Sequence, residues 1–442
     1  MWNGFTHRIY FEQHIFICQL YANLLVQIRF AFIKLINKQL IDCIRIINIQ
    51  QKALLLFGNM KKFCLYSFLG FLIACVAVYF IDTEDEIFWL KPFSERMEIQ
   101  NYPHQTHFFI TEDKWNITIF RIAAKGSHQT AFKKDYKAKP IILIPQLLNC
   151  VDSYVINDEE LSPAFVLANA GFDVWLVTNR GSEYSPNLDK IEEEYSFHEM
   201  GYYDLSMAFE YVHNITNQKV SGLGHSQGAN VILVALAEKR LNHVDKVFII
   251  APGTHIKSAS YLTDWLAKSN LPDDLYKSQK QVGSKTRFGN KMSKYTPFIS
   301  RTITLFFCDG WESELNMKNV FRIASHDLQP TSTKNLLHWA QLKRLGGFFK
   351  FDYGKEKNLQ IYKQDSPPLY DLSNIAESIH IFHGIHDILT TKEEMMELYN
   401  TFKNGKATNV TYQEYERSGH ISFMLGKSAE YTRDLIRILN DD

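Results

Sequence analysis

Short apolar runs alternate with amphipathic stretches along most of the chain after about residue 85. Apolar runs of about four to eight residues are typical of buried strands, whereas apolar positions repeating every three or four residues indicate helices. Strands are predicted at 107–111, 115–121, 140–144, 172–178, 219–224, 247–250, 379–383 and 410–415. Helices are predicted at 163–170, 202–214, 227–239, 391–404 and 428–439. This alternation predicts an α/β fold with a mostly parallel central sheet and helices on both faces.

The alternation stops between residues 253 and 371, where few strand patterns and many aromatic residues occur. A compact domain rarely contains a structureless loop of this length. We therefore expect a mainly helical inserted subdomain at 253–371. It would divide the α/β core into a first part at 85–252 and a second part at 372–442.

An uninterrupted apolar run follows two lysines and occupies residues 63–81. If translation starts at Met60, residues 60–82 have the basic start and apolar core of a signal peptide. If translation starts at Met1, the run is long enough to span a bilayer as a signal anchor and would attach the chain to a membrane. Either arrangement predicts that the rest of the chain enters the secretory pathway.

Residues 1–59 mix apolar, basic, Asn and Gln residues, and their status is doubtful. They would form either membrane-surface helices or an upstream leader outside the working protein, and we favour the leader. Three N-glycosylation sequons begin at Asn116, Asn214 and Asn409, which fits a lumenal chain. About as many sequons would arise by chance in a chain this rich in asparagine.

Composition argues against several other classes of protein. The chain has 48 basic and 48 acidic residues, whereas nucleic-acid binders carry clustered basic excess. It contains neither a Gly-rich phosphate loop nor a His-Glu-x-x-His zinc pair, and its six cysteines include no C-x-x-C pair. We therefore expect no metal, no organic cofactor and no nucleic-acid partner.

Residues 224–228 read Gly-His-Ser-Gln-Gly, the pattern of a nucleophile elbow. A serine hydroxyl is a poor nucleophile at neutral pH and needs a neighbouring base, and a tight strand-to-helix turn exposes it. A predicted strand precedes the motif and a predicted buried helix follows it, which a chance occurrence would lack. The pattern predicts Ser226 as the nucleophile, with Gly224 and Gly228 permitting the strained, closely packed turn.

The order of the partners along the chain narrows the choice of base and acid. In this fold the acid follows the serine and the histidine follows the acid. Only His420 lies beyond Asp387, which itself follows an apolar strand at the edge where catalytic groups gather. Asp387 would orient His420 and stabilise its imidazolium form. Asp365 and Asp371 are rival acids that precede this strand, and His386 is interpreted as a polar loop residue.

Two backbone N–H groups should stabilise the negatively charged oxygen of the tetrahedral intermediate. One is the N–H of Gln227, directly after the predicted nucleophile. The second is predicted at Leu147, in the loop that follows the strand at 140–144.

At these residues the chain resembles the acid lipases, the family of gastric, lingual and lysosomal ester lipases. The resemblance covers about residues 85 to 440. It is carried by Leu167–Gly181, Tyr195–Leu205, Gly224–Gly228, Asn335–Gln341 with Tyr353-Gly354, and Asp365–Asp371. It implies an α/β-hydrolase fold, an inserted cap with a lid, and Ser226, Asp387 and His420 as the triad. It also implies a lysosomal, lumenal or secreted enzyme for neutral lipid esters, such as triacylglycerols and sterol esters, at a lipid–water interface.

The chain departs from the family pattern at two places. Pro145 and Gln146 stand where the family has His-Gly, and a positive φ at Gln146 would cost about 1–3 kcal/mol. Cys308 is the only cysteine of the insertion, so the family's cap disulfide lacks a partner. Arg180 and Asp204 lie in matching blocks and are interpreted as a structural ion pair or as loop anchors.

These observations predict a lipase or carboxylic ester hydrolase that works through an acyl-enzyme. Two alternatives remain open on the sequence. The first is a hydrolase of short-chain esters or thioesters. The second is a catalytically weak lipid-binding relative, which only the altered loop at 145–146 favours.

Overall fold

The computed structural model describes residues 84–127, 132, 137–187, 194–256, 261–283, 302, 304–305, 308–310, 313–320, 322 and 329–441. The predicted extension at 1–59 and the predicted signal segment at 60–82 lie outside these residues. Within the described part of the chain, no helix combines the length and the apolar character needed to cross a membrane.

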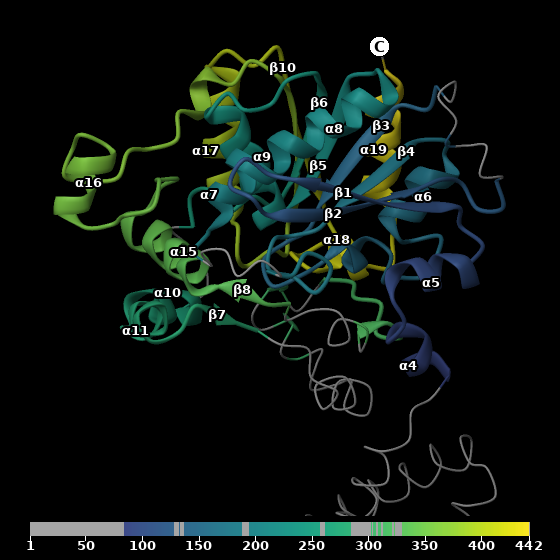
Figure 1. Cartoon of the computed structure of the whole chain (residues 1–442), viewed down its shortest axis with the longest axis horizontal. Coiled ribbons are helices and arrows are strands. Elements are labelled where there is room, and N and C mark those ends of the chain that lie inside the picture. Colours follow the sequence, from purple (N-terminus) through teal and green to yellow (C-terminus); the bar gives the residue numbers. More distant parts are fainter. Residues whose placement is uncertain are drawn as a thin grey trace, which may run out of the picture. The chain divides into compact units, whose positions relative to one another are not determined.

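Eight strands form the central sheet in the order β1-β2-β4-β3-β5-β6-β9-β10 (Figure 1). Their bounds are β1 His104–Ile110, β2 Asn116–Ile122, β3 Pro140–Ile144, β4 Asp173–Val177, β5 Val220–His225, β6 Val244–Ile250, β9 Ser378–Gly384 and β10 Asn409–Tyr415. β2 pairs antiparallel with β1 and β4, and the remaining neighbours pair in parallel. The predicted mostly parallel α/β sheet is therefore confirmed.

Helices cover both faces of the sheet, as the sequence predicts. They are α5 Phe93–Ile99, α6 Pro163–Asn169 and α19 Glu430–Asn440 on one face, and α8 Ser206–Thr216, α9 Gln227–Ala237 and α17 Lys392–Lys403 on the other. Side chains alternate accordingly along β3, where Ile142 and Ile144 pack towards α8 and α9 while Ile141 and Leu143 pack towards α6. Burial of each such side chain contributes about 1.5–3 kcal/mol, so the central strands are apolar on both faces.

Shorter helical segments connect these elements. They are α4 Glu84–Trp89, α7 Phe197–Glu199, α18 Ser422–Leu425, the 3-10 turns η2 Val151–Tyr154 and η4 Leu372–Asn374, and the π-helical turn η3 Met200–Leu205. α7 begins with a capping box, in which Ser196 accepts the N–H of His198 and Glu199 accepts the N–H of Ser196. This box satisfies N–H groups that would otherwise lack an acceptor at the start of α7, which continues directly into η3 and α8.

Between β6 and β9 the chain leaves the sheet, and we call residues 253–371 the β6–β9 insertion. Its described elements are α10 Tyr261–Lys268, α11 Leu271–Ser278, β7 Gln281–Val282, β8 Thr331–Ser332, α15 Thr333–Leu345 and α16 Lys355–Ile361. Figure 1 shows them gathered beside the sheet. α15 is capped by Ser332, which accepts the N–H of Lys334, and ends at Leu345, followed by Gly346 with φ 71°.

Candidate active site

The residue Ser226 sits in the turn between β5 and α9 with φ 54° and ψ −118°. Such a backbone conformation costs roughly 1–3 kcal/mol in a residue other than glycine, so its surroundings must hold it. Ser226 N donates to the carbonyl oxygen of Ile250 at 2.8 Å. The Ser226 carbonyl accepts from Ala229 N and Asn230 N at 3.0 and 3.2 Å, which begins α9.

The two glycines of the motif allow backbone segments to touch. An added Cβ at Gly228 would lie 2.1 Å from the carbonyl oxygen of Ile144. An added Cβ at Gly224 would lie 2.4 Å from the carbonyl carbon of Gly228. Neither position has room for a side chain without moving β3 or α9, which is why the turn requires this spacing of glycines.

The structure brings Ser226, His420 and Asp387 together in one chain of hydrogen bonds. His420 Nε2 lies 2.9 Å from Ser226 Oγ, and His420 Nδ1 lies 2.8 Å from Asp387 Oδ2. The Asp387 carboxylate also accepts Leu389 N and Thr390 N at 2.8 and 2.9 Å, and Thr390 Oγ1 at 2.7 Å. With Asp387 held in this way, His420 can accept the Ser226 proton at Nε2 while it donates at Nδ1.

At His420 and Asp387, burial and neighbouring charges shift the pKa in opposite directions. Burial would lower the pKa of His420, but the carboxylates of Asp387 and Asp309 outweigh it and raise that pKa above its usual value. Burial would raise the pKa of Asp387, but the charge of His420 and the hydrogen bonds from His420 and Thr390 lower it. Burial, with the charge of His420, lowers the pKa of the neighbouring His225 to about 3, so His225 stays neutral.

The other candidates from the sequence take no part in this chain of hydrogen bonds. Asp365 and Asp371 are exposed, and Asp371 accepts the Ser373 hydroxyl at 2.6 Å. His386 meets the neighbouring segments through its backbone, since its carbonyl accepts Gly310 N and its N–H donates to the Ser418 carbonyl.

Asp309 is a site residue that the sequence did not reveal. It lies in the β6–β9 insertion, is fully buried, and forms an isolated bridge with Asp387. Its carboxylate accepts Ile421 N at 2.6 Å and Ser422 N at 3.2 Å. It therefore holds the loop that carries His420. No local motif signals this role, because the contact joins positions more than a hundred residues apart.

The two predicted oxyanion donors belong to different elements. Gln227 is the first residue of α9, where backbone N–H groups have no acceptor within the helix. Asn179 Nδ2 donates to the carbonyl oxygens of Gln146 and Asn149, both at 3.2 Å. Because C=O and N–H point in opposite directions across a trans peptide, the first bond turns the N–H of Leu147 away from Asn179.

The altered loop at Pro145 and Gln146 does not require a positive φ at Gln146. The positive φ falls at Leu148, with 57°, and not at Gln146. The Gln146 side chain is 6% exposed, and within the described residues its Oε1 meets no hydrogen-bond donor. Gln146 thus adds an unsatisfied acceptor to this loop where the resemblance implied a glycine.

Arg180 and Asp204 form the ion pair that the sequence suggested. Arg180 Nε donates to Asp204 Oδ2 at 2.8 Å, and its other nitrogens also reach Asp204 and Asp113. The pair is buried beneath the aromatic rings of Trp115 and Tyr195, so it ties the loop after β4 to η3. Among the described residues, no group of three His, Cys, Asp or Glu side chains is arranged to hold a metal ion.

The family to which this fold and site belong is shown by comparison with known proteins. The family model of the alpha/beta hydrolase fold matches residues 139–427, which is more than half of the chain. The chain therefore belongs to the alpha/beta hydrolase family.

Two related proteins confirm the narrower resemblance to acid lipases. Gastric triacylglycerol lipase of Rattus norvegicus is 28% identical over 79% of this chain and 91% of its own length. Lysosomal acid lipase/cholesteryl ester hydrolase of Homo sapiens is 28% identical over 76% of this chain and 87% of its own length. A solved protein structure from Sulfolobus solfataricus, 12% identical with a TM-score of 0.51, covers 77% of this chain and 93% of its own, and shares the fold.

Proposed function

We propose that this protein is a lipase that hydrolyses carboxylic esters of neutral lipids through Ser226, His420 and Asp387. The observation that carries this proposal is the hydrogen-bonded chain from Ser226 Oγ through His420 to Asp387, at 2.9 and 2.8 Å. Serine hydrolysis requires a hydroxyl as nucleophile, an imidazole as base and a carboxylate that orients the imidazole, and Ser226, His420 and Asp387 would supply these three groups.

In the first half of the reaction, Ser226 Oγ attacks the ester carbonyl carbon while His420 Nε2 takes the hydroxyl proton. The carbonyl oxygen becomes an oxyanion, which the backbone N–H groups of Gln227 and Leu147 would stabilise. When the intermediate collapses, the bond to the alcohol breaks and His420 returns the proton to the leaving oxygen. The product is an acyl group esterified to Ser226.

In the second half, water replaces the alcohol. His420 removes a proton from the water as its oxygen attacks the acyl carbon, and the Ser226 oxygen then leaves with that proton. A fatty acid is released and the free serine is restored. Asp387 keeps its charge throughout and stabilises the imidazolium of His420 in both halves.

The relatives support a lipid ester as the substrate, because both have names that describe lipases, one of triacylglycerol and one also of cholesteryl ester. We propose that the β6–β9 insertion serves as the cap over the site. The chain would then meet its substrate at a lipid–water interface in the secretory pathway, a location consistent with the names of the gastric and lysosomal relatives.

The test compares the purified full-length chain with Ser226→Ala on three substrates: long-chain triacylglycerol, a sterol ester and a short-chain p-nitrophenyl ester. Loss of the nucleophile should reduce kcat by roughly 10³-fold or more. Wild-type protein no faster than Ser226→Ala on every ester would contradict an enzymatic role and favour a lipid-binding one. Turnover restricted to the short ester would identify a small-ester hydrolase instead.

A further inference from the structure

The side chain of Gln227 ends in a buried contact with α15 of the β6–β9 insertion. Gln227 is 1% exposed, and its Oε1 accepts Asn335 Nδ2 at 2.9 Å and Trp339 Nε1 at 2.8 Å. An indole N–H can only donate, so the oxygen of the Gln227 amide must face α15. Two donors on one buried oxygen leave this side chain a single orientation.

The two donors are themselves held in place. Asn335 is fully buried, its Oδ1 accepts Phe197 N at 2.9 Å, and its Nδ2 also reaches Thr331 Oγ1 at 3.1 Å. The Trp339 ring packs so closely on the backbone after β6 that an added Cβ at Gly253 would lie 2.5 Å from it. The contact to Gln227 is therefore part of a buried hydrogen-bond network, in which the Gln227 amide nitrogen also lies 3.6 Å from the sulfur of Met200.

We propose that α15 positions the backbone N–H of Gln227 for the oxyanion, with Asn335 and Trp339 as positioning residues. This inference rests on the proposed ester hydrolase function. The side chain and the backbone N–H of Gln227 share one Cα, so a fixed side chain restricts rotation of the peptide that carries the donor. Such a donor stabilises a transition state only if it is aligned beforehand, and a misplacement of about 1 Å can cost up to roughly 100-fold.

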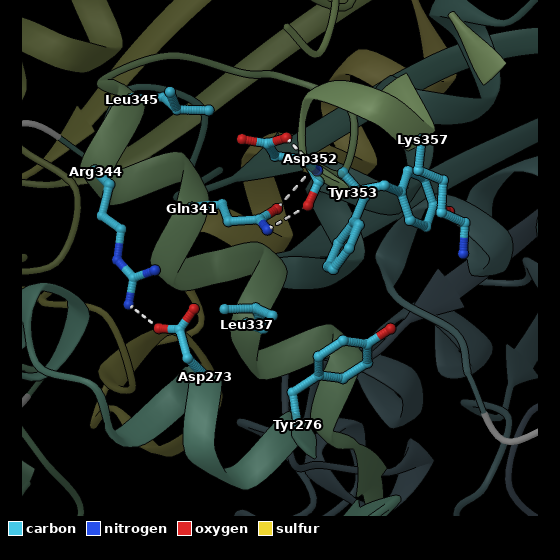
Figure 2. Close-up of a pocket in the computed structure, with 11 residues that line it drawn as sticks. Asp273, Tyr276, Leu337, Gln341, Arg344, Leu345, Asp352, Tyr353 and Lys357 are labelled. Carbon is cyan, nitrogen blue, oxygen red and sulfur yellow. Dashed lines mark hydrogen bonds and ion pairs between the residues drawn. The ribbon is translucent and has the colours of Figure 1, made fainter. Parts of the chain in front are cut away.

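Two variants remove the contacts one at a time. Asn335→Ala deletes one donor, and Trp339→Phe deletes the other while it keeps an aromatic ring on Gly253. The matched control is Gln341→Ala, on the same helix. Gln341 also makes two hydrogen bonds, to Asp352 N at 2.9 Å and Asp352 O at 2.8 Å (Figure 2). Gln341 and Asp352 line a separate pocket of about 400 Å³, and their two hydrogen bonds do not involve Gln227.

The measurement separates transition-state from ground-state binding. The oxygen of Ser226 can add to the carbonyl of a trifluoromethyl ketone, which gives a tetrahedral adduct that carries an oxyanion. An ether of the same length and shape has no carbonyl and cannot form this adduct. We expect Asn335→Ala to lower kcat on a short-chain ester about tenfold or more and to weaken ketone inhibition by a similar factor. Inhibition by the ether should change less than about threefold, and Trp339→Phe should act in the same direction. Gln341→Ala should match the wild type in both assays.

Several outcomes would overturn the inference. One is that Asn335→Ala and Trp339→Phe keep wild-type kcat and ketone affinity. Another is that the ketone and the ether weaken equally, which indicates a general loss of the site. If thermal melting shows Asn335→Ala to be unfolded, Trp339→Phe decides the question alone. A wild-type protein that neither hydrolyses esters nor binds the ketone would overturn the proposed function itself, and that failure is visible before any variant is made.

Discussion

Asp309 brings a second carboxylate to the loop that carries His420. One of its oxygens accepts Ile421 N and the other accepts Ser422 N, an arrangement that suits the ionised form because a protonated oxygen accepts poorly. Burial raises the pKa of Asp309, as does the charge of Asp387, while the N–H of Ile421 and the charge of His420 oppose the rise. Asp309 and Asp387 therefore both act on the same imidazole.

Replacing Asp309 by Asn should move the acid limb of the pH profile of kcat/KM to lower pH. His420 accepts a proton only when it is neutral, and the charges of Asp387 and Asp309 raise its pKa. Removal of one charge lowers that pKa, so His420 becomes competent at lower pH. The neighbouring His225 stays neutral and does not alter the sign. The rate on a soluble ester, measured across pH, tests this.

The same measurement on a second variant distinguishes the electrostatic effect of Asp309 from its support of the loop. Asp309→Ala loses both acceptors, whereas Asp309→Asn keeps one carbonyl oxygen for the loop. If Asp309 merely supports the loop, both variants would lower kcat and the melting temperature without displacing the acid limb. An acid limb that stays in place, or moves to higher pH, in a folded Asp309→Asn protein would refute the electrostatic role.

From the sequence alone, we could identify as site candidates those side chains whose positions follow from strand ends. Ser226 and Asp387 each follow a buried strand, and His420 follows the last one, so the parallel sheet brings them to one edge. Asp309 and Asn335 could not be found in this way. Their contacts depend on how the β6–β9 insertion folds back onto the core, and no periodic pattern encodes that path.

At the scale of elements, α7 and α15 are joined by a buried ion pair. Lys334 Nζ donates to Glu199 Oε1 at 2.7 Å, and the two side chains are 5% and 16% exposed. Beside the pair, His338 Nδ1 lies 3.0 Å from Ser196 Oγ, the cap of α7. Burial would raise the pKa of Glu199, but the charges of Lys334 and His198 and the hydrogen bonds it accepts lower it to about 2.

Glu199→Gln should destabilise the fold by about 3 kcal/mol or more near neutral pH, because it leaves Lys334 buried without a counter-charge. A depressed carboxylate pKa contributes stability that is complete above the ordinary value of 4.5 and is lost as pH falls towards about 2. The difference in melting temperature between wild type and variant should therefore be full at pH 6 and should shrink below pH 4.5.

A surface pair provides the control for this measurement. Lys91 and Glu95 form an i,i+4 pair whose side chains are 30% and 45% exposed. Glu95→Gln should cost less than about 1 kcal/mol, because exposed pairs are screened by solvent. Equal effects of Glu199→Gln and Glu95→Gln would contradict the assignment of the first pair as a structural link between α7 and α15.

The sheet was predictable from the sequence for a physical reason. Central strands buried on both faces, such as β3 with five buried residues in succession, produce apolar runs that stand out from their surroundings. α4 and α5 were missed, since they are only six and seven residues long and show too little periodicity. β7 and β8 have two residues each and pair across about fifty positions, so no local pattern could predict them.

At the scale of the whole molecule, the question is which compartment the chain enters. The three sequon asparagines Asn116, Asn214 and Asn409 are all exposed, at the start of β2, on α8 and at the start of β10. An oligosaccharide at any of them would project into solvent without disturbing the core. The related proteins include a gastric and a lysosomal lipase, and this is consistent with entry of the chain into the secretory pathway.

The chain expressed in eukaryotic cells should therefore carry N-linked glycans, because entry into the secretory lumen would expose these asparagines to glycosylation. Digestion with an N-glycosidase should increase its electrophoretic mobility, and each Asn→Gln change at 116, 214 or 409 should remove one step of that shift. The control is Asn217→Gln, which changes an asparagine outside any sequon and should leave the shift intact. A folded, active chain whose mobility the glycosidase does not alter would contradict lumenal entry. Mass spectrometry of the same sample identifies the mature N-terminus, which separates a cleaved segment at 60–82 from a retained anchor.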